Sequence, residues 1–207
     1  MAEHDTARIE AFSDGVFAIA ITLLILTIQP PVAAEFTSNR ALLESLARLW
    51  PSFLAFLLSF IVILMIWANH HDFFRMLRAA DRSLLFANGG LLLMVTFLPF
   101  PTAVLAGHLH GAASNAAVGF YCSTLFVTSI AHNVLLEVAA HSHKLIRPDV
   151  SGAEIAQVRK AYRLGLLAYA TATLVSVWSV GAALVITTSL WVLWTPMRHG
   201  FAKRSTR

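Results

Sequence analysis

The 207-residue chain is 57% hydrophobic and 13% charged, and its mean hydropathy is +0.70. This composition excludes an ordinary soluble domain, and several apolar runs of spanning length predict an all-α membrane protein. The single cysteine, Cys122, excludes an intrachain disulfide. The opening stretch MAEHDTARIEAF lacks the basic region and cleavage site of a signal peptide, so we expect no cleaved leader.

The first predicted helix begins after Asp5 or Thr6, either of which can cap it, and ends before Pro30–Pro31. About 24 residues of helix measure roughly 36 Å, which is enough to cross a bilayer. The second helix begins at Trp50–Pro51, because proline is favoured in the first turn of a helix. Pro99 lies inside the third apolar run, so a kink is expected there.

Between Tyr162 and Pro196 the only charged residue is Arg163. One helix of that length would measure about 52 Å, so we expect two helices that meet near Ser179–Gly181. The chain then has six spans in a single domain, 1–207, without an internal repeat of the first helix. The approximate spans are 6–29, 50–69, 84–106, 114–140, 162–178 and 181–196.

Nearly all of the positive charges fall on one side of the predicted membrane topology. Of the 15 Lys and Arg residues, only Arg40 and Arg48 fall in loops that six spans place outside. The positive-inside rule therefore predicts that both termini are cytoplasmic. Five spans would move the C-terminal tail outside and make the distribution much more even. We expect a multi-pass protein of the cell (inner) membrane, whose net charge of +4 faces anionic lipid rather than nucleic acid.

A carboxylate inside the first span needs a partner. If this helix starts near Thr6, Ser13 and Asp14 lie about 10 Å inside it, where an unpaired charge is costly. The antiparallel second helix brings polar groups to the same depth as Arg8 and Asp14, namely Trp67, His70 and His71. We expect hydrogen bonds among them. Alternatively, Asp14–Gly15 forms a turn before a short interfacial helix, which leaves only five full spans.

The first helix also carries an apolar stripe. At about 100° per residue, its members lie within about 60° of Ile19, whereas Asp14 lies about 140° away. The other members are Gly15, Thr22, Leu23 and Leu26. Ile and Leu on a membrane helix usually pack against protein or face lipid, so the stripe alone does not define a pore.

Three stretches of the sequence resemble the transmembrane protein 175 family, which comprises the endolysosomal potassium channel and its prokaryotic relatives. The first is Arg8-x3-Phe12-Ser13-Asp14, followed by an apolar helix. The second is WANHHDFF, with Trp67, His70 and Phe74, and the third is NGGLLLMVTFLPF, with Asn88, Thr96 and Pro99. They cover the first half of the chain, and the last three helices match the family only in hydropathy and length.

The resemblance implies a potassium-favouring cation channel without a TVGYG filter, a sequence that is absent here. It implies that the first helix lines the pore. The residues that it assigns to an apolar constriction, or hydrophobic gate, are Ile19, Leu23 and Leu26, with Thr22 as a polar ring beside them. It also implies a homotetramer of single-repeat, prokaryotic-type chains that passes K⁺ and other monovalent cations without a cofactor or bound metal. The expected structural polar motif comprises Arg8, Phe12, Ser13, Asp14, Trp67, His70 and Asn88.

Two other classes of function have weaker support in the sequence. An enzyme is not expected, because the sequence has no HExxH, P-loop or GxSxG motif. Glu137 and His141 are spaced i, i+4 and can bind zinc, but such a pair at a helix end is more often solvated. The stronger alternative is a proton-coupled secondary transporter or a proton-leak pathway that uses Asp14 and His70. Against a transporter, the sequence shows no inverted repeat.

Overall fold

The computed structural model describes residues 2–31, 38–142 and 144–190. These ranges contain helices and no β-strand; the only strand-like pairing among them is one antiparallel bridge between Leu77 and Ile146. In chain order the helices are α1 (Ala2–Leu23), the 3₁₀-helix η1 (Leu24–Thr27), α2 (Asn39–Arg48), α3 (Trp50–Phe74), α4 (Arg82–Phe97), α5 (Pro99–His108), α6 (Ser114–His141), α7 (Gly152–Val175) and a shorter apolar helix, Val180–Leu190.

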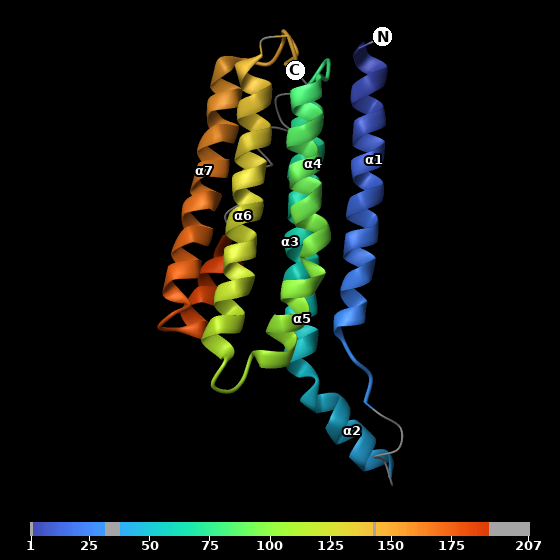
Figure 1. Ribbon diagram of the computed structural model, residues 1–207, viewed down its shortest axis with the longest axis vertical. Helices are drawn as coiled ribbons and strands as arrows, with labels where there is room; N and C mark the ends of the chain where they lie inside the picture. Colours follow the sequence, from blue (N-terminus) through green and yellow to red (C-terminus); the bar gives the residue numbers. More distant parts are fainter. Residues whose placement is uncertain (1, 32–37, 143, 191–207) are drawn as a thin grey trace, which may run out of the picture.

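Helices α1, α3, α4, α6 and α7 lie side by side along the long axis of the molecule, with α1 at one edge and α7 at the other (Figure 1). Helix α1 packs on α3 and α4, and α6 packs on α4, α5 and α7. The N-terminal end of α1 lies at the same end of the bundle as the α3–α4 and α6–α7 loops. These are segments that the distribution of Lys and Arg assigns to one side of the membrane.

Within the described ranges, four helical segments are long and apolar enough to cross a membrane: Thr6–Thr27, Trp50–Phe74, Arg82–His108 and Ser114–His141. They correspond to the first four predicted spans, so the prediction of an all-helical membrane protein is confirmed. The second segment continues past residue 69 to Phe74. The third is divided at Leu98, where Pro99 opens α5, because proline cannot supply the backbone N–H that a continuous helix needs.

The helix that contains most of the predicted fifth span, 162–178, starts before that span does. Helix α7 begins at Gly152, where the Ser151 side chain accepts the Glu154 N–H and the Glu154 carboxylate accepts the Ser151 N–H. The charged residues Glu154, Arg159 and Lys160 therefore belong to the helix. Val180–Leu190 begins the predicted sixth span, whose remainder, 191–196, lies outside the described residues. The count of six spans stays a prediction.

The first predicted loop is partly helical. Helix α2 starts after Ser38, whose hydroxyl accepts the Ala41 N–H, and it meets α3 at Leu49. It projects at an angle from the end of the bundle (Figure 1). Its sequence, NRALLESLAR, is short and carries two arginines and a glutamate, so hydropathy gave no signal for it.

Helices α6 and α7 come close where Gly119 faces Ser176. A Cβ at Gly119 would lie 2.9 Å from the Ser176 Oγ, closer than side-chain carbons normally come. Ser176 is buried and its hydroxyl donates to the Thr173 carbonyl at 2.6 Å, so it has little room to yield. We expect Gly119→Ala to lower the free energy of unfolding by about 1 kcal/mol or more, measured by thermal unfolding in detergent.

The double variant Gly119→Ala/Ser176→Ala provides the control. It removes the Oγ and leaves the Ser176 Cβ 3.9 Å from the new methyl group, which is an ordinary contact distance. Most of the lost stability should return in the double variant. A double variant as unstable as Gly119→Ala alone would contradict the assignment of the loss to this contact.

Candidate pore helix and polar cluster

One face of α1 and the following η1 is buried in the core of the chain. Its members recur every three or four residues and so share one side of the helix: Ser13, Phe17, Ala20 and Leu24. Phe17 stands edge-on to the ring of His70 on α3, with ring centroids 5.3 Å apart. Because α1 packs on both α3 and α4, this buried face fixes the rotation of the helix about its own axis.

The opposite face carries the predicted constriction residues, and the described chain leaves it open. The exposed fraction is 60% for Ile19, 44% for Leu23 and 65% for Leu26. Gly15 and Thr22, on the same face, are also exposed. An apolar strip of this kind inside a spanning segment must be covered by lipid or by another protein surface.

The last turn of this helix is 3₁₀ rather than α, which the sequence did not indicate. Side chains three residues apart eclipse in a 3₁₀-helix, so Leu26 keeps the direction of Leu23. The rise of about 2.0 Å per residue spaces the two more widely than an α-helix would. The Thr22 hydroxyl donates to the Ile19 carbonyl at 2.9 Å, and its oxygen lone pairs stay on the open face.

A buried chain of hydrogen bonds joins α3, α4 and α1. His70 Nε2 lies 2.8 Å from Asn88 Oδ1, and an amide oxygen only accepts, so this nitrogen is the donor. Asn88 Nδ2 donates to Ser13 Oγ at 3.0 Å, and the Ser13 hydroxyl donates to the Ile9 carbonyl at 2.8 Å. The three side chains are buried. This chain of hydrogen bonds therefore fixes the register of the three helices.

Two further contacts join α1 to α3 nearer the surface. Trp67 Nε1 donates to Asp14 Oδ1 at 2.8 Å, one of the pairings expected from the sequence. One turn away, His71 Nδ1 lies 2.7 Å from Glu10 Oε1. Residues four apart share a face in each of the two antiparallel helices, so the first contact predicts the second. Glu10 was nevertheless not predicted as a partner of α3.

Not every residue of the expected polar motif joins this cluster. His70 bonds Asn88 rather than Asp14. Arg8 is exposed, and no ion pair links it to Asp14 in the described part of the chain. The Phe12 side chain is exposed on α1. Of the three alternative partners expected for Asp14, namely Arg8, His70 and Trp67, the described residues therefore show Trp67.

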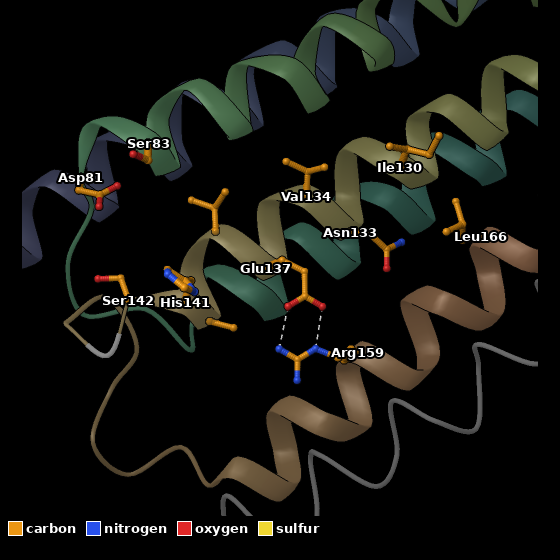
Figure 2. A pocket seen from close by; sticks show the side chains of 12 residues that line it. Asp81, Ser83, Ile130, Asn133, Val134, Glu137, His141, Ser142, Arg159 and Leu166 are labelled. Carbon is orange, nitrogen blue, oxygen red and sulfur yellow. Dashed lines mark hydrogen bonds and ion pairs between the residues drawn. The ribbon is translucent and has the colours of Figure 1, made fainter.

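Glu137 on α6 pairs with an arginine instead of with His141. Arg159 of α7 contacts it twice, Nε to Oε1 at 2.7 Å and Nη2 to Oε2 at 2.8 Å (Figure 2). Arg163 lies 3.5 Å from the same carboxylate, while His141 is exposed. No group of three or more metal-binding side chains occurs among the described residues. Glu137 thus belongs to an ion pair between α6 and α7 in which His141 takes no part.

These features define a multi-pass helical membrane protein in which one spanning helix is buried on one face and open on the other. Residues 8–99 match the family described as endosomal/lysosomal potassium channel TMEM175. A potassium channel of Chamaesiphon minutus is 42% identical over 189 residues, which are 89% of this chain and 92% of that protein. The chain belongs to the TMEM175 family, and the resemblance seen in the sequence is confirmed.

A crystal structure of a lysosomal potassium-selective channel TMEM175 homolog from Chamaesiphon minutus has the same fold, with a TM-score of 0.81 and 38% identity, over 99% of this chain and 100% of that one. The endosomal/lysosomal proton channel TMEM175 of Homo sapiens is 32% identical over 189 residues, covering 84% of this chain and 37% of the human protein. These relatives are named as ion channels and not as enzymes. The chain is a multi-pass protein of the cell membrane.

Proposed function

We propose that this chain forms a cation channel that favours potassium and conducts passively across the membrane. The observation that carries the proposal is the open apolar face of α1, which is turned away from a buried face on the same helix. A relative of similar length and a solved structure of the same fold are named potassium channels. In the proposed pore, Ile19, Leu23 and Leu26 form successive apolar rings, and Thr22 adds a ring of hydroxyl oxygens.

The proposal includes a homotetramer, because one copy of α1 cannot surround a pore. Helix α1 lies at the edge of the bundle (Figure 1), so its open face can meet other copies without disturbing its packing on α3 and α4. Closed rotational symmetry then places four copies of α1 around one axis. Six spans, cytoplasmic termini, a single domain over 1–207 and a pore that needs no cofactor are parts of the same proposal.

The mechanism depends on water. An apolar ring too narrow for liquid water is a barrier to a hydrated ion, and widening it lets water and ions pass. Potassium gives up its hydration more easily than sodium, so a tight apolar ring favours potassium modestly without coordinating carbonyls. The Thr22 oxygen lies on the same open face and can replace part of the lost hydration there.

The test measures both the mass of the assembled protein and the ion current that it conducts. Native mass spectrometry of the purified chain in mild detergent should give a tetramer, and the same sample in a planar bilayer should give single-channel currents. With potassium on one side and sodium on the other, the reversal potential should indicate preferred passage of potassium. A monomer that conducts as single molecules would overturn the assembly, and a flux that saturates like a carrier would overturn the channel.

The alternative is a proton pathway through Asp14 and His70, and the name of the human relative favours it. In this chain the His70 Nε2 proton is committed to Asn88, and Asp14 is bonded by Trp67. A direct relay between the two side chains would have to break both contacts. The alternative predicts that, at fixed potassium, the reversal potential of the unaltered chain follows a pH gradient. It would be established if this dependence on pH were lost in Asp14→Asn.

A further inference from the structure

Two loops lie at the same end of the bundle (Figure 1) and are joined by backbone hydrogen bonds. The Arg78 N–H donates to the Leu145 carbonyl at 2.8 Å, and the Arg147 N–H donates to the Met76 carbonyl at 2.9 Å. Leu77 and Leu145 are buried and belong to the core of the chain. The α3–α4 loop and the α6–α7 loop therefore form one fixed junction and not two independent loops.

Arg78 brings two positive charges together at this junction. Its Nε donates to the Lys144 carbonyl at 3.0 Å, so the guanidinium lies against the backbone from which the Lys144 side chain extends. Both side chains are exposed. Within the described ranges, no acceptor contacts the Nη atoms of Arg78 or the ammonium of Lys144. The flexible stem of a lysine lets its ammonium reach an acceptor that the guanidinium already holds, so one anion can contact both cations.

The two carboxylates of these loops already have partners, whereas several cations do not. Asp149 accepts from Arg147 through both of its oxygens, at 3.0 Å each. Asp81 accepts the Leu84 N–H at the start of α4. As far as the structure describes the chain, no ion pair involves the following exposed basic residues of the two loops and their flanks: Arg75, Arg78, Arg82 and Lys144. An anion that balances them has to come from outside the described residues.

The lengths of the helices place the junction among lipid headgroups. Helices α3 and α6, of 25 and 28 residues, measure roughly 37 and 42 Å, against about 30 Å for the hydrocarbon core of a bilayer. Their ends at Phe74 and His141 therefore emerge from the hydrocarbon, and the junction follows directly after both. The proposed orientation places this end in the cytoplasmic leaflet, where anionic lipids attract basic segments.

We propose that Arg78 and Lys144 together bind the phosphate of an anionic phospholipid, such as phosphatidylglycerol, in the cytoplasmic leaflet. A phosphate has several oxygen acceptors, which suit a guanidinium and an ammonium side by side. Phosphatidylcholine carries its own ammonium next to the phosphate, so its headgroup is neutral overall and the two cations attract it less. The inference rests on the membrane orientation that belongs to the proposed function.

The test is native mass spectrometry of the full chain, purified in mild detergent and incubated with equal amounts of dioleoyl phosphatidylglycerol and dioleoyl phosphatidylcholine. Each basic residue near the surface favours the anionic lipid about fivefold, so phosphatidylglycerol should be retained roughly twentyfold over phosphatidylcholine. Lys144→Gln should reduce this preference about fivefold. It should leave the fold intact, because Lys144 makes its hydrogen bond among the described residues through its backbone carbonyl. Arg78→Gln should have a similar effect on the preference, and Arg78→Lys should restore most of it.

Lys160→Gln is the matched control, because it removes the charge of another exposed lysine, on the first half of α7. It should keep the lipid preference of the unaltered chain. Equal retention of the two lipids would overturn the proposal. So would equal losses in Lys160→Gln and Lys144→Gln, which would indicate diffuse attraction to the whole surface, or an Arg78→Lys variant that restores nothing. The readout involves no ion current, so a conducting channel without the preference counts against this inference alone, and a silent protein that shows it counts against the proposed function alone.

Discussion

Replacing Ile19 with Asn is expected to raise the single-channel conductance and to weaken discrimination against sodium. The amide would hydrate the proposed ring and lower the barrier that dewetting creates. A barrier lower by about 1.4 kcal/mol permits about tenfold faster passage, and four copies of the substitution would act on one ring, so an increase of at least this size is expected. The measurement is conductance together with reversal potential between potassium and sodium solutions.

Ile21→Asn is the control on the same helix. Ile21 is partly buried and packs against the core, so its substitution should reduce stability and leave permeation nearly unchanged. Leu23→Ala and Leu26→Ala should raise conductance with a smaller loss of selectivity, since they widen outer rings without making them polar. If Ile19→Asn left both quantities unchanged while Ile21→Asn altered them, the pore-lining face would be assigned wrongly.

Asn88→Ala is expected to produce the largest loss of stability in the polar cluster. It removes the acceptor of the buried His70 N–H and the donor to Ser13 in one step. The unsatisfied His70 N–H costs about 1–3 kcal/mol. The lost bond to Ser13, which keeps its bond to the Ile9 carbonyl, adds about 1 kcal/mol, so the total is a large part of the stability of many folded domains. Thermal unfolding in detergent and the yield of the assembled protein should both fall.

Asn133→Ala is the matched control for Asn88→Ala. The Asn133 amide donates to the carbonyls of Ser129 and Tyr162, which lie in helices and accept backbone N–H groups there. Its loss should therefore cost much less. Channels that survive the Asn88 substitution should keep their reversal potential; a normal yield with an altered ion preference would instead place Asn88 in the permeation pathway.

The sequence of α1 alone predicts that the helix has two apolar faces. Helical spacing placed Ile19, Leu23 and Leu26 on one face, and the same periodicity places Phe17 and Leu24 on the other. What periodicity does not reveal is which of two apolar faces the chain buries, because both are made of similar residues. Only packing against α3 and α4 decides this point.

The polar cluster was predicted only in part, for a reason of geometry. The Asp14–Trp67 contact follows from the depth of the two residues in antiparallel helices. The contact of Asn88 with Ser13 depends on how α4 lies against α1, and no local pattern specifies the register of helices that are distant in sequence. The family resemblance named Asn88 without indicating its partners.

The start of α7 could not be predicted from hydropathy. Glu154 and Arg159 precede the predicted span 162–178 because hydropathy falls there, yet Glu154 completes the cap that starts α7, and Arg159 of α7 faces Glu137 of α6. A helix can extend beyond the hydrocarbon layer, where charged side chains meet water and headgroups at little cost. Hydropathy measures the apolar stretch of a helix and not its full length.

The two side-chain contacts between α1 and α3 also determine how far each part of α1 can travel. Glu10 and Asp14 attach its N-terminal half to His71 and Trp67, so a tilt of the helix would pivot near Asp14. The distance from that pivot acts as a lever arm, roughly 8 Å for Ile19 and roughly 18 Å for Leu26. Any given tilt therefore moves Leu26 more than twice as far as Ile19, so in the proposed pore the Leu26 ring would change its width more than the Ile19 ring.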